Sequence, residues 1–162
     1  MSRLDSFIRR MSAQRDCLDR AAELIADVPG PVLELGLGNG RTYDHLRELL
    51  PGREIYVFDR RVAAHPDCIP DDRHMILGDI RETLPAANRR VPEPAALVHT
   101  DIGTGNEAAN LEQARWLGPT LKPLLAPGAV VVSDQPMPVE DWEELPLPAG
   151  VPERRYFMYR NR

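Results

Sequence analysis

Five short apolar runs constrain the fold of this chain more than any other feature of its sequence. They occupy residues 32–35, 55–58, 74–77, 95–98 and 129–132. Apolar runs of this length without polar alternation are typical of strands buried on both faces of a parallel sheet. The segments between the runs are helix-compatible, notably residues 42–50 and 106–125. This alternation predicts βαβ units, and therefore an α/β fold with a doubly wound, mostly parallel Rossmann-like sheet and helices on both faces.

The first 28 residues carry apolar side chains at steps of three and four, with Arg and Asp between them. This spacing predicts an amphipathic N-terminal helix, which Pro29-Gly30-Pro31 would end. Such a helix could cover a ligand site as a lid. It could equally pack against a neighbouring element or a second subunit, and the sequence leaves these alternatives open.

The C-terminal part of the chain has a weaker pattern. Residues 142–147 and 155–160 are the candidates for a short antiparallel end of the sheet, and we expect the strand over residues 155–159 to lie at its edge. Pro119 and Pro123 fall in or near the long helix at residues 106–125, which predicts a kink or a break there.

Length and composition narrow the class of protein. A chain of 162 residues fits one domain, and we expect an N-terminal helical segment (1–28) followed by the sheet-forming core (30–162). The net charge of −5 argues against binding to nucleic acid or to an anionic membrane surface. No apolar run is long enough to span a bilayer, and the first residues do not resemble a signal peptide. The two cysteines are too few for a disulfide framework, so we expect a cytoplasmic location.

A glycine-rich loop follows the first apolar run. Gly36, Gly38 and Gly40 alternate with other residues, and a helix begins near Arg41 and Thr42. Glycine allows the backbone to turn sharply and lets a ligand approach the main chain. The helix N-terminus adds unpaired N–H groups and a positive dipole end. We therefore expect a nucleotide-type ligand at this edge of the sheet.

Acidic residues end the second and third runs at the same edge. Asp59 closes the second run, where a carboxylate can accept hydrogen bonds from both hydroxyls of a ribose. Gly78-Asp79-Ile80 closes the third, where an adenine would lie. Either acid alone is also explained as a helix N-cap, since Asp is favoured there. Together with the glycine loop, the two acids favour a nucleotide-type ligand.

The glycine motif identifies a family. Arg41 stands where the Gly-x-Gly-x-x-Gly dinucleotide fingerprint needs its third glycine, and the pattern is Gly-x-Gly-x-Gly with Glu34 two residues before it. With Asp59 and Asp79, this arrangement resembles the class I, Rossmann-like S-adenosylmethionine-dependent methyltransferases over residues 30–135.

The resemblance implies S-adenosyl-L-methionine as the cofactor. The glycines would cradle its methionine part, Asp59 would bind the ribose and Asp79 the adenine amino group. The full set of expected cofactor-binding residues is Glu34, Gly36, Leu37, Gly38, Asn39, Gly40, Arg41, Thr42, Asp59, Arg60, Gly78, Asp79, Ile80 and Asp101. Two alternatives are a non-catalytic S-adenosylmethionine-binding module and an NAD-dependent oxidoreductase. Arg41, in place of the third glycine, argues against the oxidoreductase.

The methyl acceptor would lie beyond the fourth run. The segment 96–105 lacks the Asn/Asp-Pro-Pro-aromatic motif of many amino-methyltransferases, which favours a small-molecule acceptor, with a hydroxyl as one candidate. His99 and Asp101 are two residues apart, so they share a face of the strand. We expect both to be catalytic, with His99 as a general base. A histidine that is hydrogen-bonded in the protein interior is the alternative for His99.

The fifth run is followed by Ser133-Asp134-Gln135. The C-terminal half is similar to the catechol-type O-methyltransferases, in which an Asp after strand four and an Asp-Asn pair after strand five hold Mg²⁺. Asp101, Asp134 and Gln135 match these positions, with Gln in place of Asn. A cap at Asp134 and a loop amide at Gln135 are the alternative, so Mg²⁺ is only a candidate. A homodimer that completes the acceptor pocket is also open.

Overall fold

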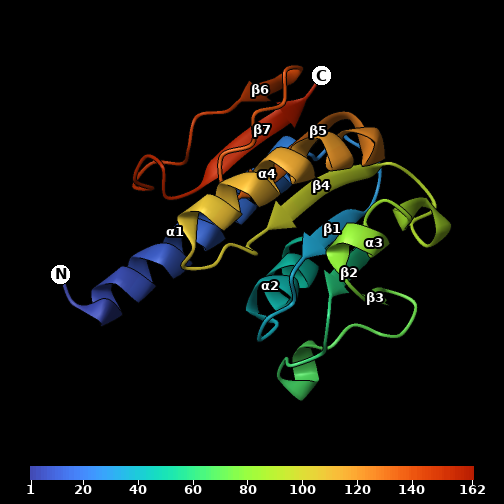
Figure 1. The fold of residues 1–162 in the computed structure, drawn as a ribbon, viewed down its shortest axis with the longest axis horizontal. Helices are drawn as coiled ribbons and strands as arrows, with labels where there is room; N and C mark the ends of the chain where they lie inside the picture. The colour runs from blue at the N-terminus through green and yellow to red at the C-terminus, as the bar shows by residue number, and fades with distance from the viewer.

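The computed structural model describes all 162 residues, and they form one seven-stranded sheet (Figure 1). The order of the strands in the sheet is β3-β2-β1-β4-β5-β7-β6. Their bounds are β1 Val32–Leu35, β2 Ile55–Asp59, β3 Met75–Leu77, β4 Ala95–Thr100, β5 Leu125–Ser133, β6 Trp142–Glu144 and β7 Phe157–Asn161. The first five strands pair in parallel, and β7 runs antiparallel to β5 and β6. The predicted mostly parallel, doubly wound sheet is confirmed.

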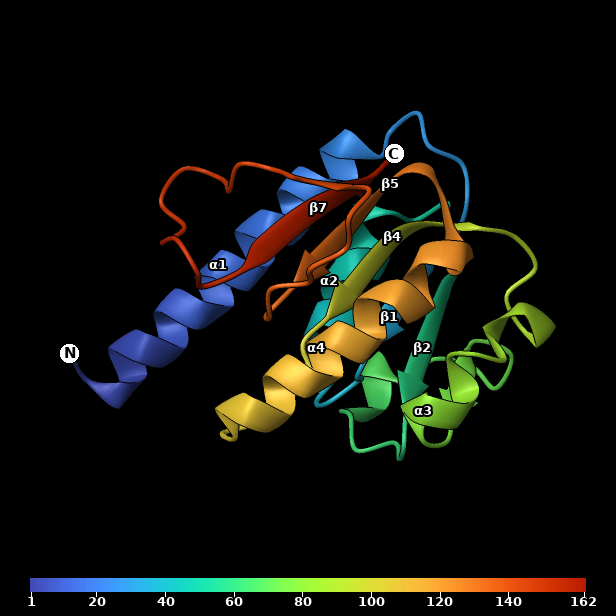
Figure 2. The ribbon, with the colours of Figure 1, turned by 45° about the horizontal axis from the view of Figure 1, so that its top comes forward.

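Helices cover both faces of the sheet, as the apolar runs predict. The α-helices are α1 Arg3–Leu24, α2 Arg41–Leu49, α3 Ile80–Thr83 and α4 Glu107–Leu121, and the 3-10 turns are Pro66–Cys68, Ala87–Arg89 and Lys122–Leu124. One core joins α1 and α2 to the strands through residues such as Leu18 and Leu46. The other core includes Leu117 of α4 and Leu84, just after α3. Figure 2 shows α1 and α4 on opposite sides of the sheet.

Two helix ends differ from the predicted ones. The first helix ends at Leu24, and residues 25–27 form a turn that leads into the sheet. Pro119 lies inside α4, which continues for two residues beyond it, and Pro123 then lies in the 3-10 turn after the helix. Proline cannot donate a backbone hydrogen bond, so the change to a 3-10 turn at Lys122–Leu124 fits its position.

The predicted edge strand is not at the edge, which corrects the sequence analysis. β7 lies between β5 and β6, because the three residues of β6 pair along its outer side. Trp142 of β6 donates its indole N–H to Asn161 Oδ1 over 3.2 Å, and Asn161 Nδ2 donates to Ala126 O over 3.0 Å. This buried amide joins β6, β7 and β5, which a weak three-residue pattern could not reveal.

The register of the parallel strands brings the predicted ligand residues to one edge. Leu35 at the end of β1 pairs with Phe58 of β2 and with Thr100 of β4. The glycine loop, Asp59 and Asp101 therefore leave the sheet side by side.

None of the helices combines the length and the apolar character that a membrane crossing requires.

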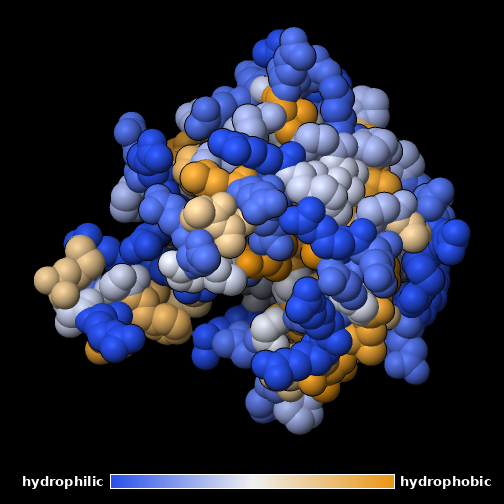
Figure 3. Space-filling view, viewed as in Figure 1, coloured by the Kyte–Doolittle hydropathy of each residue, from blue (hydrophilic) through white to orange (hydrophobic).

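The N-terminal half of α1 projects beyond the sheet, where Figure 3 shows it standing clear of the body of the molecule. Leu4, Phe7 and Ile8 on this half are exposed, whereas Cys17, Leu18 and other residues of the second half are buried. The helix therefore anchors with one half and overhangs the carboxyl edge of the sheet with the other.

Candidate active site

The glycine loop between β1 and α2 has a backbone that only glycine adopts without strain. Gly36 and Gly40 have φ angles of 93° and 86°, in the left-handed region. A Cβ on Gly36 would lie 2.9 Å from the Ile102 side chain, and one on Gly40 would lie 2.9 Å from the Cys68 carbonyl oxygen. Both close approaches fix the loop between β4 and the segment after β2.

Asp59 at the end of β2 holds this loop through its carboxylate. Its Oδ2 accepts hydrogen bonds from the backbone N–H of Leu37 over 2.8 Å and of Gly38 over 3.4 Å. Its Oδ1 accepts from the backbone N–H of Arg60 over 2.6 Å. Asp59 thus has a structural task in addition to the ribose contact expected of it.

A cavity of about 500 Å³ lies over the glycine loop. The residues around it are Phe7, Arg10, Met11, Gln14, Gly36, Leu37, Gly38, Asn39, Arg41, Thr42, Asp59, Asp101 and Ile102. Eight of these thirteen are expected cofactor-binding residues. The four from α1 were not predicted individually, although their steps of three and four place them on one face of the helix. Their presence fits the lid alternative for the outer half of α1.

Glu34 and His99 are buried and do not line this cavity. They are neighbours on adjacent strands, and Glu34 Oε1 is 2.5 Å from His99 Nδ1, with both side chains buried. Burial lowers the pKa of His99, but the adjacent Glu34 carboxylate outweighs it, so the pKa is raised overall. Glu34 Oε2 and His99 Nε2 have no hydrogen-bond partner.

The predicted adenine-binding segment after β3 also lies outside the cavity lining. Asp79 is the N-cap of α3, where Oδ1 accepts from the Arg81 backbone N–H over 2.9 Å. Its Oδ2 also accepts from Arg60 Nη2 over 3.2 Å. Gly78 and Ile80 flank this cap. The structure therefore shows the capping geometry that the sequence left as the alternative for Asp79.

Asp101, one residue beyond β4, is the polar centre of the site. Its Oδ2 accepts from Gln14 Nε2 over 2.6 Å and from Arg10 Nη2 over 3.2 Å. Gln14 Nε2 also donates to the Tyr156 hydroxyl over 2.7 Å. The Tyr156 ring stacks on His99 at 6.2 Å between centroids, with 10° between the planes. α1, β4 and the segment before β7 therefore meet at this carboxylate.

A second cavity of about 490 Å³ opens on the other side of Asp101. Its lining consists of Arg10, Asp101, Gly103, Thr104, Gly105, Asp134, Gln135, Arg154, Arg155 and Tyr156. Burial and the charge of Asp101 raise the pKa of Asp134 to about 6, although the backbone N–H of Gly103 stabilises its carboxylate from 3.1 Å. Burial raises the pKa of Tyr156 far above its usual range. Arg10 and Asp101 belong to both cavities.

The structure does not show a ready site for Mg²⁺ at its three candidate residues, Asp101, Asp134 and Gln135. Asp101 Oδ2 faces N–H donors of Arg10 and Gln14, and Asp134 Oδ2 faces the N–H of Gly103. No three His, Cys, Asp or Glu side chains are grouped so that they could hold a metal ion. Mg²⁺ requires several oxygen ligands in near-octahedral geometry, whereas the Oδ2 atom of each aspartate is already engaged by N–H donors.

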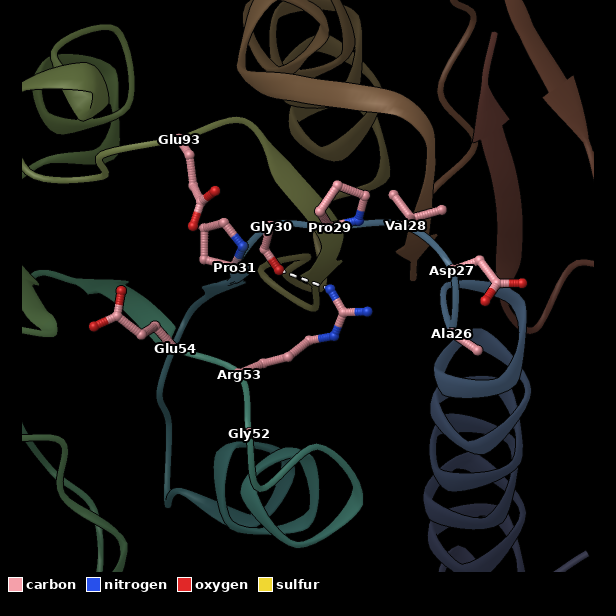
Figure 4. A pocket seen from close by; sticks show the side chains of 10 residues that line it. All are labelled: Ala26, Asp27, Val28, Pro29, Gly30, Pro31, Gly52, Arg53, Glu54 and Glu93. Atoms are coloured by element: carbon pink, nitrogen blue, oxygen red, sulfur yellow. Dashed lines mark hydrogen bonds between the residues drawn. The ribbon is translucent and has the colours of Figure 1, made fainter.

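A third cavity, of about 570 Å³, lies at the opposite edge of the sheet (Figure 4). It is formed by residues 26–31 and 52–54 together with Glu93. Arg53 donates to Gly30 O over 2.8 Å and to Ile25 O over 2.7 Å. These bonds join the end of α1 to the start of β1 and β2, so Arg53 has a structural task in this cavity.

Comparison with known proteins agrees with this geometry. The family model of S-adenosyl-L-methionine methyltransferases matches residues 1–161. The crystal structure of an S-adenosyl-L-methionine methyl transferase from Silicibacter pomeroyi DSS-3 is 53% identical in sequence, with a TM-score of 0.93. The match covers 100% of this chain and 99% of that one. No curated protein matches.

More distant structures share the fold. TrmN from Thermus thermophilus is 16% identical with a TM-score of 0.60, over 89% of this chain and 48% of that one. The methyltransferase MycE of the mycinamycin biosynthetic pathway, solved with Mg, SAH and mycinamycin VI, is 17% identical with a TM-score of 0.57, over 89% of this chain and 44% of that one. At these identities the likeness concerns the architecture alone.

Proposed function

Since the chain belongs to the S-adenosyl-L-methionine methyltransferase family, we propose that it transfers the cofactor's methyl group to a small molecule bound beyond Asp101. The observation that carries this proposal is the position of Asp101 between two cavities. One cavity has the glycine loop, and the other has the polar groups for an acceptor. The family match favours this activity over the oxidoreductase alternative.

The cavity over the glycine loop, called the cofactor cavity below, has groups suited to S-adenosylmethionine. The N-terminus of α2 lies beside Arg41 and Thr42 and suits the cofactor's carboxylate. The carboxylate of Asp59 would hold the ribose while it fixes the loop. Phe7 and Met11 of α1 supply apolar cover from the opposite side.

Bound S-adenosylmethionine supplies a methyl group on a sulfonium, which is already a strong electrophile. The task of the protein is therefore mainly to align the acceptor. Good alignment of two reactants can lower the activation barrier by about 7–11 kcal/mol. We assign the orientation of the acceptor and the removal of its proton to Asp101. Arg10 and Gln14 hold this carboxylate in place between the cavities.

His99 takes a positioning role in this proposal rather than that of a base at the acceptor. It is fully buried, it lines neither cavity and its Nδ1 is engaged by Glu34. Its ring supports Tyr156, whose hydroxyl accepts from the same Gln14 amide that donates to Asp101. The pair can therefore influence Asp101 only through its neighbours.

A small-molecule acceptor is supported by the size of the second cavity. About 490 Å³ falls within the usual range of small-ligand pockets, roughly 300–1,000 Å³. The distant structural neighbour MycE also holds the small molecule mycinamycin VI. We further propose that residues 1–162 act as a single domain, in the cytoplasm, where Cys17 and Cys68 would stay reduced.

The test is a transfer assay with methyl-labelled S-adenosylmethionine and a cell extract separated into small molecules and macromolecules. We expect labelled product in the small-molecule fraction with the wild-type chain, and at least 100-fold less with Asp101→Asn. Label that enters only protein or nucleic acid would refute the small-molecule proposal. S-adenosylhomocysteine binding, measured by calorimetry in parallel, establishes that each protein preparation is competent.

A further inference from the structure

The second cavity contains positive charge that the protein does not use. Arg10 pairs with Asp101, but no ion pair or side-chain hydrogen bond engages Arg154 or Arg155. The other charged groups of the cavity have partners within the protein: Asp101 has Arg10 and Gln14, and Asp134 has the N–H of Gly103. Arg154 and Arg155 are thus the charged groups of this cavity whose side chains have no partner within the protein.

The backbone places these two arginines at the cavity rather than leaving them on a loose tail. Arg154 has a φ of 65°, the only positive value at a residue other than glycine, and the Arg155 N–H donates to Pro152 O over 3.2 Å. The turn runs directly into the buried Tyr156, which Gln14 anchors through its hydroxyl. Arg155, next to Tyr156 in the sequence, is half-buried, and Arg154 is exposed to solvent.

Arginine guanidinium groups that line a cavity bind carboxylates and phosphates in preference to other groups. Their planar fork matches a carboxylate or a phosphate with two parallel hydrogen bonds, and such charge-assisted bonds are about twice as strong as neutral ones. Arginines beside a cavity with almost no apolar lining are suited to an anion rather than to an apolar group. They do not line the cofactor cavity, so the cofactor's carboxylate does not account for them.

We infer that Arg154 and Arg155 bind an anionic group of the methyl acceptor, which makes the acceptor an acidic small molecule, a carboxylate or a phosphate ester. This inference rests on the proposed function, because it assumes that the second cavity receives the acceptor. Arg154 and Arg155 hold the acid at one end of the cavity. The atom to be methylated then lies towards Asp101, which borders the cofactor cavity.

The test uses defined probes on the protein loaded with S-adenosylhomocysteine. Benzoate and phenyl phosphate are titrated by calorimetry or by NMR, with benzamide as the neutral counterpart of benzoate. We expect one or both anions to bind, at least tenfold more tightly than benzamide, and to lose at least tenfold in affinity in the variant Arg154→Ala/Arg155→Ala. The comparison of the two anions distinguishes a carboxylate acceptor from a phosphate one.

Matched controls separate charge at this site from charge in general. Arg115→Ala removes an exposed arginine of α4 that lines neither cavity, and it should bind the anions as the wild type does. Arg155→Lys keeps the charge but loses the fork, and it should weaken binding less than Arg155→Ala. Thermal unfolding verifies that each variant is folded.

Two results would overturn the inference. One is that neither anion binds the wild type, or that benzamide binds equally well. The other is that the double variant binds the anions as tightly as the wild type. S-adenosylhomocysteine affinity should be the same in all these proteins, since neither arginine lines its cavity. Failure of the wild type to bind S-adenosylhomocysteine would contradict the proposed function instead.

Discussion

Glu34 of β1 and His99 of β4 form a buried pair, with 2.5 Å between Oε1 and Nδ1. The acid that precedes the glycine loop therefore contacts a histidine on the neighbouring strand instead of lining the cofactor cavity. Because both groups are removed from water, each depends on the other to offset its desolvation. The His99 ring of this pair also stacks on Tyr156, which lines the second cavity.

Glu34→Gln should lower the free energy of unfolding by about 3 kcal/mol, because it removes one partner of a buried pair. The pKa of His99 is raised in the folded protein, so its contribution is full below the unfolded value of about 6.5 and declines as the pH rises through the raised value. Urea unfolding of wild type and variant across this pH range measures both effects. The exposed Glu112→Gln is the control, and identical pH slopes in wild type and Glu34→Gln would contradict the prediction.

Asp59→Ala should weaken S-adenosylhomocysteine binding at least 100-fold. The variant loses the expected ribose contact and also frees the backbone N–H groups of Leu37 and Gly38, which shape the loop. Calorimetry measures the affinity, with the exposed Asp72→Ala as the control. Unchanged affinity in Asp59→Ala would show that the cofactor does not use this edge of the cavity.

Asp101→Asn should keep S-adenosylhomocysteine affinity within about threefold and reduce methyl transfer at least 100-fold. The substitution preserves shape and can still accept from Gln14, but it removes the charge that, in our proposal, takes the acceptor's proton. Single-turnover transfer of labelled methyl, with binding measured separately, distinguishes the two effects. Wild-type turnover in this variant would remove Asp101 from the proton-handling role.

Phe7→Ala should weaken S-adenosylhomocysteine binding about five- to tenfold without lowering the melting temperature. Phe7 lines the cofactor cavity and is 47% exposed, and the Arg41 guanidinium lies 5.8 Å from its ring centre. Leu4→Ala, one turn earlier and outside the cavity, should change nothing. Equal affinity in both variants would show that α1 is not a lid for the cofactor.

Only one of the two thiols should react in the native protein. Burial raises the pKa of Cys17 to about 12, and its side chain has no exposed surface, whereas Cys68 is half-buried. Titration with Ellman's reagent at pH 8 should therefore count one thiol per chain, and a second one after unfolding in guanidinium chloride. Two fast thiols would mean that α1 detaches from the sheet on the timescale of the reaction.

The strands and the glycine loop were predictable because each is encoded by a local pattern. Val130, Val131 and Val132 can only be buried in a sheet covered on both faces, and glycines at 36 and 40 are required by positive φ angles. The position of β7 was not predictable, because it depends on which strand the short β6 pairs with. A strand's pattern encodes its burial but not its neighbours.

The contacts within the site were harder to predict from the sequence than the candidate residues themselves. Asp101 was predicted as a site residue from its place after a strand, but its hydrogen-bond partners Arg10 and Gln14 lie 91 and 87 positions away in the sequence. Their approach depends on how α1 docks across the sheet. Likewise, Glu34 and His99 are paired by the register of β1 and β4, and no spacing along the chain encodes that register.

The sharing of Asp101 and Arg10 by the two cavities has a thermodynamic consequence. A ligand that shifts these side chains in one cavity changes the binding free energy in the other. Linkage requires that this coupling be reciprocal: the factor by which the cofactor alters acceptor affinity equals the factor by which the acceptor alters cofactor affinity. Gln14, which joins Asp101 to Tyr156 through one amide nitrogen, is the contact at which that coupling factor can be varied without adding or removing charge.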